Sequence, residues 1–174
     1  GLVSVMGGKW TNCRPMALDT LAAVERQLGQ TLPSPKAMTL LGSGPTPTAT
    51  RDKLEEQKNQ LKDLLLNTPQ RDAQIAHLQG SHGLQAVPLI AAAAPEERAP
   101  LSDVIPLCEA EIVHAIKVEQ ARSSTDVLAR RCRLAMVDFA EAQRLEPLTE
   151  KHLAQSGLES AATSTSPMSH QLNP

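Results

Sequence analysis

Aromatic side chains are almost absent from this sequence, which contains one tryptophan, one phenylalanine and no tyrosine. Rings usually dominate a protein core because each one buries a large apolar area. The interior is therefore predicted to consist of leucine, alanine, valine, isoleucine and methionine, a composition that favours helices packed on helices. We expect Phe139 and Met136 to belong to this core.

Cysteine pairs are missing too. Cys13, Cys108 and Cys132 are widely spaced and form no C-x-x-C motif, which excludes a zinc ribbon or a disulfide framework. The five histidines show no H-x-x-x-H or H-E-x-x-H spacing, the arrangement that places two zinc ligands on one helix face. We expect three reduced thiols, with Cys13 buried and inert, and no metal site.

Long apolar runs and an excess of positive charge are also lacking. The longest apolar run, VPLIAAAA at 87–94, is far shorter than the ~20 residues that a membrane-spanning helix requires. The N-terminal residues carry no basic region of a secretion signal, and the formal net charge of −2 argues against general nucleic-acid binding. The sequence thus predicts a cytoplasmic protein that is not secreted, has no transmembrane segment and binds no nucleic acid.

The first 32 residues predict a strand, a turn and a helix. Residues 2–6, LVSVM, alternate like a short strand, and Gly7-Gly8 ends it. Thr11 is expected to cap the helix that follows, and Gly29 to end it in the left-handed conformation. The helix would present one apolar face, made of Met16, Thr20, Ala23, Val24 and Leu28.

The remainder of the chain has a helical pattern. Residues 33–50 are rich in proline and glycine and predict a linker, with TLL at 39–41 as one short strand inside it. Apolar stripes then predict helices over about 50–67, 70–79, 84–93, 108–122, 126–139 and 147–155. Ser123-x-x-Asp126 has the pattern of a capping box at a helix start. From Gly157 the tail is small and polar, and disorder is expected.

The Gly7-Gly8-Lys9 turn is the segment most suited to ligand binding. Glycines allow a ligand to approach the backbone, and a helix start offers unpaired N–H groups and a partial positive charge. The phosphate-binding pattern G-x-x-x-x-G-K-[ST] fails, because Val3 and Trp10 stand at its first and last positions. From the residues alone, a tight turn with an incidental lysine stays open as the alternative.

Two blocks of sequence resemble the FAD-dependent glycerol-3-phosphate dehydrogenases. GLVSVMGGKWTNCRPMALDT is similar to the end of that family's flavin domain. PLSDVIPLCEAEIVHAIKVEQARSSTDVLARRCRLAMVD is similar to its C-terminal helical domain. The matching positions are Gly7, Gly8, Lys9, Trp10, Thr11, Arg14, Met16 and Ala17, and then Pro106, Ala110, Glu111, Ala115, Glu119, Ala121, Asp126, Leu128, Arg130, Arg131 and Arg133.

The resemblance implies a mostly α fold. A short strand–turn–helix remnant of an FAD-binding α/β domain would cover residues 1–32. The linker of residues 33–50 would lead to an all-α C-terminal helical domain over 51–156, followed by the disordered tail 157–174. Nothing in the two blocks supplies a calcium-binding EF-hand loop, so no calcium regulation is expected.

The resemblance also implies an activity. Family members oxidise glycerol 3-phosphate to dihydroxyacetone phosphate, pass hydride to FAD and deliver electrons to a quinone or to oxygen, often as peripheral proteins of the inner membrane. By resemblance, Gly7, Gly8, Lys9 and Thr11 would bind the cofactor, and Lys9 would also meet the substrate phosphate. Arg14, Arg130, Arg131 and Arg133 would dock on the flavin domain. For the last three, a solvated helix face with pairs to Asp126 or Glu141 is the alternative.

Departures from the family pattern weaken this expectation. Asn12 and Cys13 replace the family's Thr and Tyr, and Cys132 replaces a Thr in the arginine-rich run. No G-x-G-x-x-G turn for the ADP part of FAD occurs anywhere in the sequence. We therefore expect that the chain cannot hold FAD alone and that an N-terminal flavin domain is missing from it. A non-catalytic helical remnant or assembly module, or one half of a split enzyme, remain alternatives.

Overall fold

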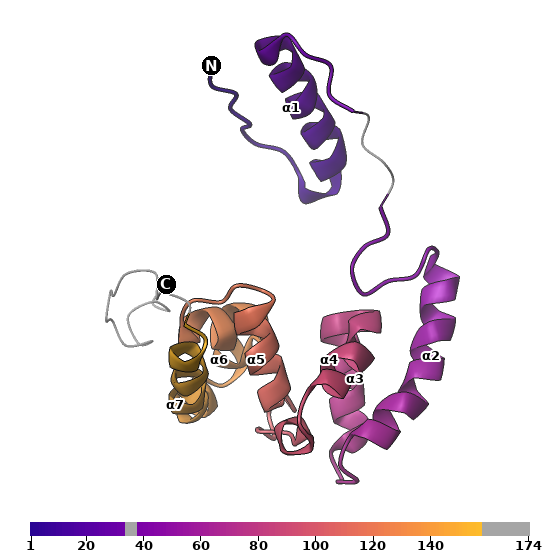
Figure 1. The fold of residues 1–174 in the computed structure, drawn as a ribbon, viewed down its shortest axis with the longest axis vertical. Helices are drawn as coiled ribbons and strands as arrows, with labels where there is room; N and C mark the ends of the chain where they lie inside the picture. Colours follow the sequence, from indigo (N-terminus) through magenta and orange to yellow (C-terminus); the bar gives the residue numbers. More distant parts are fainter. Residues whose placement is uncertain (34–37, 158–174) are drawn as a thin grey trace. The chain divides into compact units, whose positions relative to one another are not determined.

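The computed structural model describes residues 1–33 and 38–157. All the elements of regular secondary structure in these residues are helices, and none is a strand. The chain divides into two compact units, one up to Met38 and one from Thr39 onward, and Figure 1 shows the helices of each. The expected disordered tail lies outside the described residues, except for Gly157. No helix in the described ranges is both long enough and apolar enough to cross a membrane.

The first unit contains a short 3-10 helix, η1 (Trp10–Asn12), and one long helix, α1 (Cys13–Leu28). The strand predicted at residues 2–6 is wrong, because these residues form neither strand nor helix. A strand needs a neighbour for its backbone N–H and C=O groups, and the described part of this unit provides none. The segment instead runs back along α1, with Gly1 against Gln27 and Gly8 against Met16.

Helix α1 ends as its sequence predicts but does not begin as predicted. Thr11 lies inside η1, and neither helix start has a side-chain cap, so the predicted Thr11 cap is wrong. Pro15 stands in the first turn, where its missing N–H is harmless. Gly29 ends the helix with φ of 62°, as predicted. The predicted face from Met16 to Val24 is only half-buried, Leu28 is exposed, and no residue of α1 is fully buried.

The second unit is a bundle of short helices in two groups (Figure 1). The TLL segment at 39–41 forms no strand, and the helix after it already starts at Pro47, inside the expected linker. Thr46 caps this helix by accepting a hydrogen bond from the N–H of Ala49. The elements are α2 (Pro47–Leu64), α3 (Arg71–His82), η2 (Gly83–Gln85), α4 (Ala86–Ala92), η3 (Pro95–Arg98), α5 (Glu109–Lys117), η4 (Asp126–Arg131), α6 (Leu134–Val137) and α7 (Phe139–Gln155).

Two aliphatic clusters form the core, and α5 contributes to both. Leu61, Leu78 and Ile90 of α2, α3 and α4 are fully buried in the first cluster, which also takes Ala110 from α5. Ile112 and Ile116 of α5 belong to the second, with residues of η4, α6 and α7. The buried clusters of the described residues are aliphatic, as predicted. Phe139 packs against the second cluster only partly buried, whereas Met136 is 67% exposed, so its predicted core position is wrong.

The segment after α5 is more broken than the apolar pattern predicts. Half of the predicted capping box is present: the N–H of Asp126 donates to Ser123 Oγ, but the Asp126 carboxylate accepts from the N–H of Arg122 instead of that of Ser123. The helix it starts is a single π-helical turn, η4, which ends before Arg133 adopts a left-handed conformation with φ of 63°. The last helix, α7, starts at Phe139 and continues through Pro147, although a proline usually marks a boundary.

A close backbone contact joins the segment before α2 to the end of α3. The N–H of Leu84 donates to the carbonyl of Gly42 at 2.8 Å, and Gly83 touches the same carbonyl from a conformation with φ of +55°. A methyl group on Gly83 would collide with this backbone. Gly80, one turn earlier on α3, faces open space.

Two glycine substitutions should therefore act in opposite directions. Gly83→Ala is expected to lower the free energy of unfolding by about 1–3 kcal/mol, because it adds both backbone strain and a collision. Gly80→Ala should raise it by about 0.5–1 kcal/mol, because alanine loses less backbone entropy in a helix. Urea denaturation of the two variants and the parent chain measures both effects. A Gly83→Ala chain as stable as the parent would contradict the described contact.

Candidate functional site

The Gly-Gly-Lys corner of the first unit is an exposed backbone turn. Gly7 and Gly8 have φ of 76° and 103°, a region that side chains disfavour. Lys9 is extended and accepts the hydrogen bond that closes η1, from the N–H of Asn12 at 2.9 Å. Lys9 and Thr11 are exposed, as is Arg14 in the first turn of α1. The corner therefore presents free N–H groups, a hydroxyl and two cations to whatever covers it.

Cys13 also lies at this corner and is exposed, so the prediction that it is buried is wrong. Its exposure leaves the thiol accessible at the start of α1.

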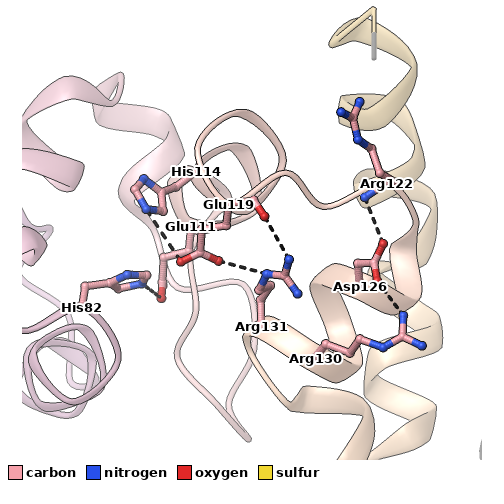
Figure 2. A network of polar contacts seen from close by, with 8 residues as sticks. All are labelled: His82, Glu111, His114, Glu119, Arg122, Asp126, Arg130 and Arg131. Carbon is pink, nitrogen blue, oxygen red and sulfur yellow. Dashed lines mark hydrogen bonds and ion pairs between the residues drawn. The ribbon is translucent and has the colours of Figure 1, made fainter. Parts of the chain in front are cut away.

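A polar network in the second unit starts at Glu111, in the first turn of α5 (Figure 2). This carboxylate is buried, with 7% of the residue exposed. It accepts hydrogen bonds from His77 Nε2 at 2.8 Å and from His82 Nε2 at 3.1 Å, both on α3. Its other oxygen accepts from the N–H of Cys108 at 2.9 Å, which caps α5. One side chain thus holds α3 and the start of α5 together.

The hydrogen bonds decide the charge of Glu111. Burial by itself would raise the pKa of this carboxyl, but the bonds from His77, His82 and the Cys108 N–H outweigh it and hold the pKa at about 2. The carboxylate is therefore ionised in the folded chain. Burial, together with this neighbouring negative charge, raises the pKa of the Cys108 thiol to about 12.

The network continues from His82 to the loop that follows α5. The rings of His82 and His114 meet edge to face, with centroids 5.5 Å apart. His114 Nε2 lies 3.9 Å from Glu119 Oε1. Burial and the nearby His82 lower the pKa of His114. The imidazole of His114 therefore tends to be neutral, with a lone pair available.

Of the three predicted interface arginines in the second unit, two are bound by carboxylates (Figure 2). Arg131 Nε lies 3.3 Å from Glu119 Oε2, and its Nη2 donates to the carbonyl of the same residue at 2.9 Å. Arg130 pairs with Asp126 at 2.5 Å, as the solvated-face alternative expected. Glu141, the other expected partner, binds Arg144 instead. Arg133 is exposed.

Burial would raise the pKa of Asp126, yet the hydrogen bonds from the Arg122 N–H, Arg130 and Ser123 lower it. The carboxylate is thus held in its ionised form at the start of η4. The Asp126 carboxylate binds the Arg122 N–H at the helix start and orients the Arg130 side chain.

A cavity of about 140 Å³ lies against this network. Its size is below the roughly 300 Å³ of the smaller ligand pockets, so it has room for water or a small ion and none for a flavin ring. Polar side chains of both signs line it beside apolar ones. The polar lining consists of Ser81, His82, Glu111, Glu119, Arg130, Arg131 and Cys132.

The histidines are the part of this site that sequence reasoning missed. A search for the H-x-x-x-H or H-E-x-x-H spacing finds nothing, because the two histidines of the cluster lie on different helices, His82 at the end of α3 and His114 on α5. The fold brings both together with Glu119, and one potential ligand atom from each lies within 4.8 Å of the others. The cluster arises from the packing of α3 with α5, so the spacing of the residues in the sequence does not predict it.

Comparisons with known proteins agree on one family. The model for the C-terminal domain of alpha-glycerophosphate oxidase matches residues 36–157. Glycerol-3-phosphate dehydrogenase SDP6, mitochondrial, of Arabidopsis thaliana is 32% identical over 154 residues, covering 83% of this chain and 24% of that protein. The probable glycerol-3-phosphate dehydrogenase, mitochondrial, of Dictyostelium discoideum is 32% identical over 151 residues, covering 82% of this chain and 22% of that protein. No solved structure matches the chain.

The chain thus spans about a quarter of the length of these curated relatives. The match to the Arabidopsis protein covers 83% of the chain, more than the second unit alone makes up. It therefore extends into the first unit.

Replacing Glu111 by glutamine should destabilise the second unit. The amide cannot accept from all three donors, and buried donors left unpaired cost about 1–3 kcal/mol in the free energy of unfolding. Glu150→Gln, on an exposed position of α7, is the matched control and should change it by less than about 0.5 kcal/mol. Urea denaturation followed by circular dichroism gives both values.

The parent chain and the Glu111→Gln variant should also differ in how their free energies of unfolding depend on pH. A carboxyl whose folded pKa is about 2, below its ordinary 4.5, stabilises the fold above its ordinary pKa and loses this effect as the pH falls through the folded pKa. The advantage of the parent chain over Glu111→Gln should therefore shrink from about pH 5 downward. A difference that stays constant to about pH 3 would contradict the assigned charge.

The three cysteines should react with thiol reagents at different rates. The thiolate is the reactive form, so buried Cys108 with its raised pKa should be labelled only after unfolding, whereas exposed Cys13 should be labelled in the native chain. Half-buried Cys132, whose pKa burial also raises, should be slow. Mass spectrometry of the labelled peptides at about pH 8 distinguishes the sites. Equal labelling of Cys108 and Cys13 would rule out the described burial.

Proposed function

The chain belongs to the family of the C-terminal domain of alpha-glycerophosphate oxidase, and on this premise we propose that it forms the C-terminal part of a flavoprotein that oxidises glycerol 3-phosphate to dihydroxyacetone phosphate. The observation that carries the proposal is the family match over residues 36–157. Two relatives named as glycerol-3-phosphate dehydrogenases support it, since each covers more than four fifths of this chain. The activity itself would need the parts of those relatives that this chain does not match.

In this proposal the Gly-Gly-Lys corner forms one wall of the cofactor site. Gly7 and Gly8 let a ligand approach the backbone, and the start of η1 and α1 offers N–H groups to an electron-rich atom. Thr11 adds a hydroxyl, and Lys9 a cation that would bind either the cofactor or the phosphate of glycerol 3-phosphate. The exposure of all four residues supports this role, because it leaves them accessible to a ligand.

FAD would accept the hydride from glycerol 3-phosphate when bound. The residues of this chain fit one side of such a group and no more. The corner can approach a flavin edge, but the cavity beside the Glu111 network is too small to hold a ring system, and the sequence has no G-x-G-x-x-G turn. What this chain would contribute is positioning and positive potential at the substrate phosphate.

The docking surface for the flavin domain would include α1 and two exposed arginines. Leu18, Leu21 and Leu28 of α1 are 40–56% exposed, which suits a helix that packs against a partner domain. Arg14 and Arg133 are exposed cations and are the better candidates for docking, because Arg130 and Arg131 already bind carboxylates. We retain all four arginines as proposed interface residues.

A quinone as electron acceptor and a peripheral position at the inner membrane stay predictions. Both relatives carry the word mitochondrial in their names. We accordingly extend the proposal to a mitochondrial inner-membrane location, in place of the cytoplasmic one that composition alone suggests.

A non-catalytic assembly module is the second candidate. It is favoured by the core of the second unit, which consists of two clusters of the unit's own side chains. Asn12 and Cys13 at the proposed cofactor wall support the same alternative.

Reconstitution separates the two functions. We expect that this chain, co-expressed with the part of the Arabidopsis relative that precedes the matched region, retains flavin and reduces an artificial electron acceptor when glycerol 3-phosphate is added. The isolated chain should bind no FAD at micromolar concentrations. A complex that forms without flavin or activity would favour the assembly module.

Lys9 is the residue to test within that complex. Lys9→Met should raise KM for glycerol 3-phosphate by about tenfold or more, because a charge-assisted hydrogen bond to phosphate contributes roughly 1.5–3 kcal/mol. Lys53→Met, on an exposed position of α2, is the control and should leave KM unchanged. Equal kinetics of the two variants would remove Lys9 from the proposed site.

A further inference from the structure

We propose that His82, His114 and Glu119 form a binding site for a divalent transition metal ion of the zinc class. The three residues come from the end of α3, from α5 and from the loop after α5, and one ligand atom from each lies within 4.8 Å of the others. Two imidazoles and one carboxylate are a donor set that zinc uses where a fourth position stays open for water. Nitrogen donors also favour transition metals over calcium and magnesium.

The distances require only side-chain adjustment. Bonds of about 2.0–2.1 Å in a tetrahedral site put ligand atoms roughly 3.3 Å apart. His114 Nε2 and Glu119 Oε1 are 3.9 Å apart, so this pair is already close to the required spacing. The Glu119 side chain is 35% exposed and belongs to no helix, which leaves it free to close on an ion arriving from solvent.

A buried carboxylate orients the first imidazole. Glu111 accepts a hydrogen bond from His82 Nε2 at 3.1 Å. In the neutral imidazole that binds a metal, this bond puts the proton on Nε2 and leaves the lone pair on Nδ1. Metal-binding histidines commonly hold such a carboxylate on their other nitrogen. Glu111 is itself fixed by His77 and the Cys108 N–H.

Arg131 orients the carboxylate ligand. It binds Glu119 Oε2 at 3.3 Å and the carbonyl of Glu119 at 2.9 Å, which directs Oε1 toward His114 (Figure 2). The cavity of about 140 Å³ is lined by His82 and Glu119, and a water molecule occupies only about 30 Å³ in the liquid. A water to complete the coordination would therefore have room. An ion here would join α3 to the loop before η4.

Metal titration of the full chain tests the site. After treatment with a chelator, the chain should bind one Co²⁺ with a visible absorption band typical of tetrahedral nitrogen and oxygen ligation, and Zn²⁺ should displace it. His114→Ala and Glu119→Gln should each weaken Zn²⁺ binding about 100-fold or more, and Glu111→Gln by about 10–100-fold. An excess of Ca²⁺ or Mg²⁺ should not compete.

His152→Ala is the matched control, because His152 also binds a glutamate, Glu109, at 2.6 Å but lies outside the cluster. It should leave the Zn²⁺ affinity unchanged. Circular dichroism confirms folding of each variant, and Glu119→Gln, which changes a partly exposed loop residue, serves if His114→Ala unfolds. Absence of the Co²⁺ band, or Zn²⁺ binding that survives Glu119→Gln or falls equally in His152→Ala, would overturn the proposal.

Discussion

The buried carboxylate of Glu111 is the interaction on which the second unit depends. It is the third residue of α5 and accepts hydrogen bonds from two histidines of α3 and from the backbone at its own helix start. An apolar side chain in its place would leave three buried donors without partners, and each such donor is costly. The position of α3 against α5, and with it the meeting of His82 and His114, follows from this one anion.

The shortage of aromatic residues explains why such a polar contact matters here. Leucine, isoleucine and alanine fill both core clusters, and aliphatic side chains of similar size pack in several registers at similar free energy. Directional hydrogen bonds discriminate between registers because a shift of one residue breaks them. The polar contacts that lead from Glu111 through Glu119 and Arg131 to η4 are directional contacts of this kind, between the elements of the two clusters.

Local signals predicted the helices well where the sequence alone decides the outcome. The left-handed Gly29, the Ser123 side chain that caps a helix start, and the helical character of the chain are all confirmed. The strand at 2–6 failed because a strand depends on a partner elsewhere. The single helix over 126–139 failed because its apolar spacing continues through a left-handed Arg133. The histidine cluster lay beyond prediction, since its members are 32 residues apart in sequence and meet only through tertiary packing.

Helix α5 contributes to both core clusters, Ala110 to the first and Ile112, Ala115 and Ile116 to the second, with α4 on one side and α7 and η4 on the other. A helix shared in this way couples the two clusters. We therefore expect the second unit to unfold as one cooperative unit, although its two clusters suggest two. In native-state hydrogen exchange, the amides of α5 would open only with the whole unit, whereas the ends of α2 and α7 would fray on their own.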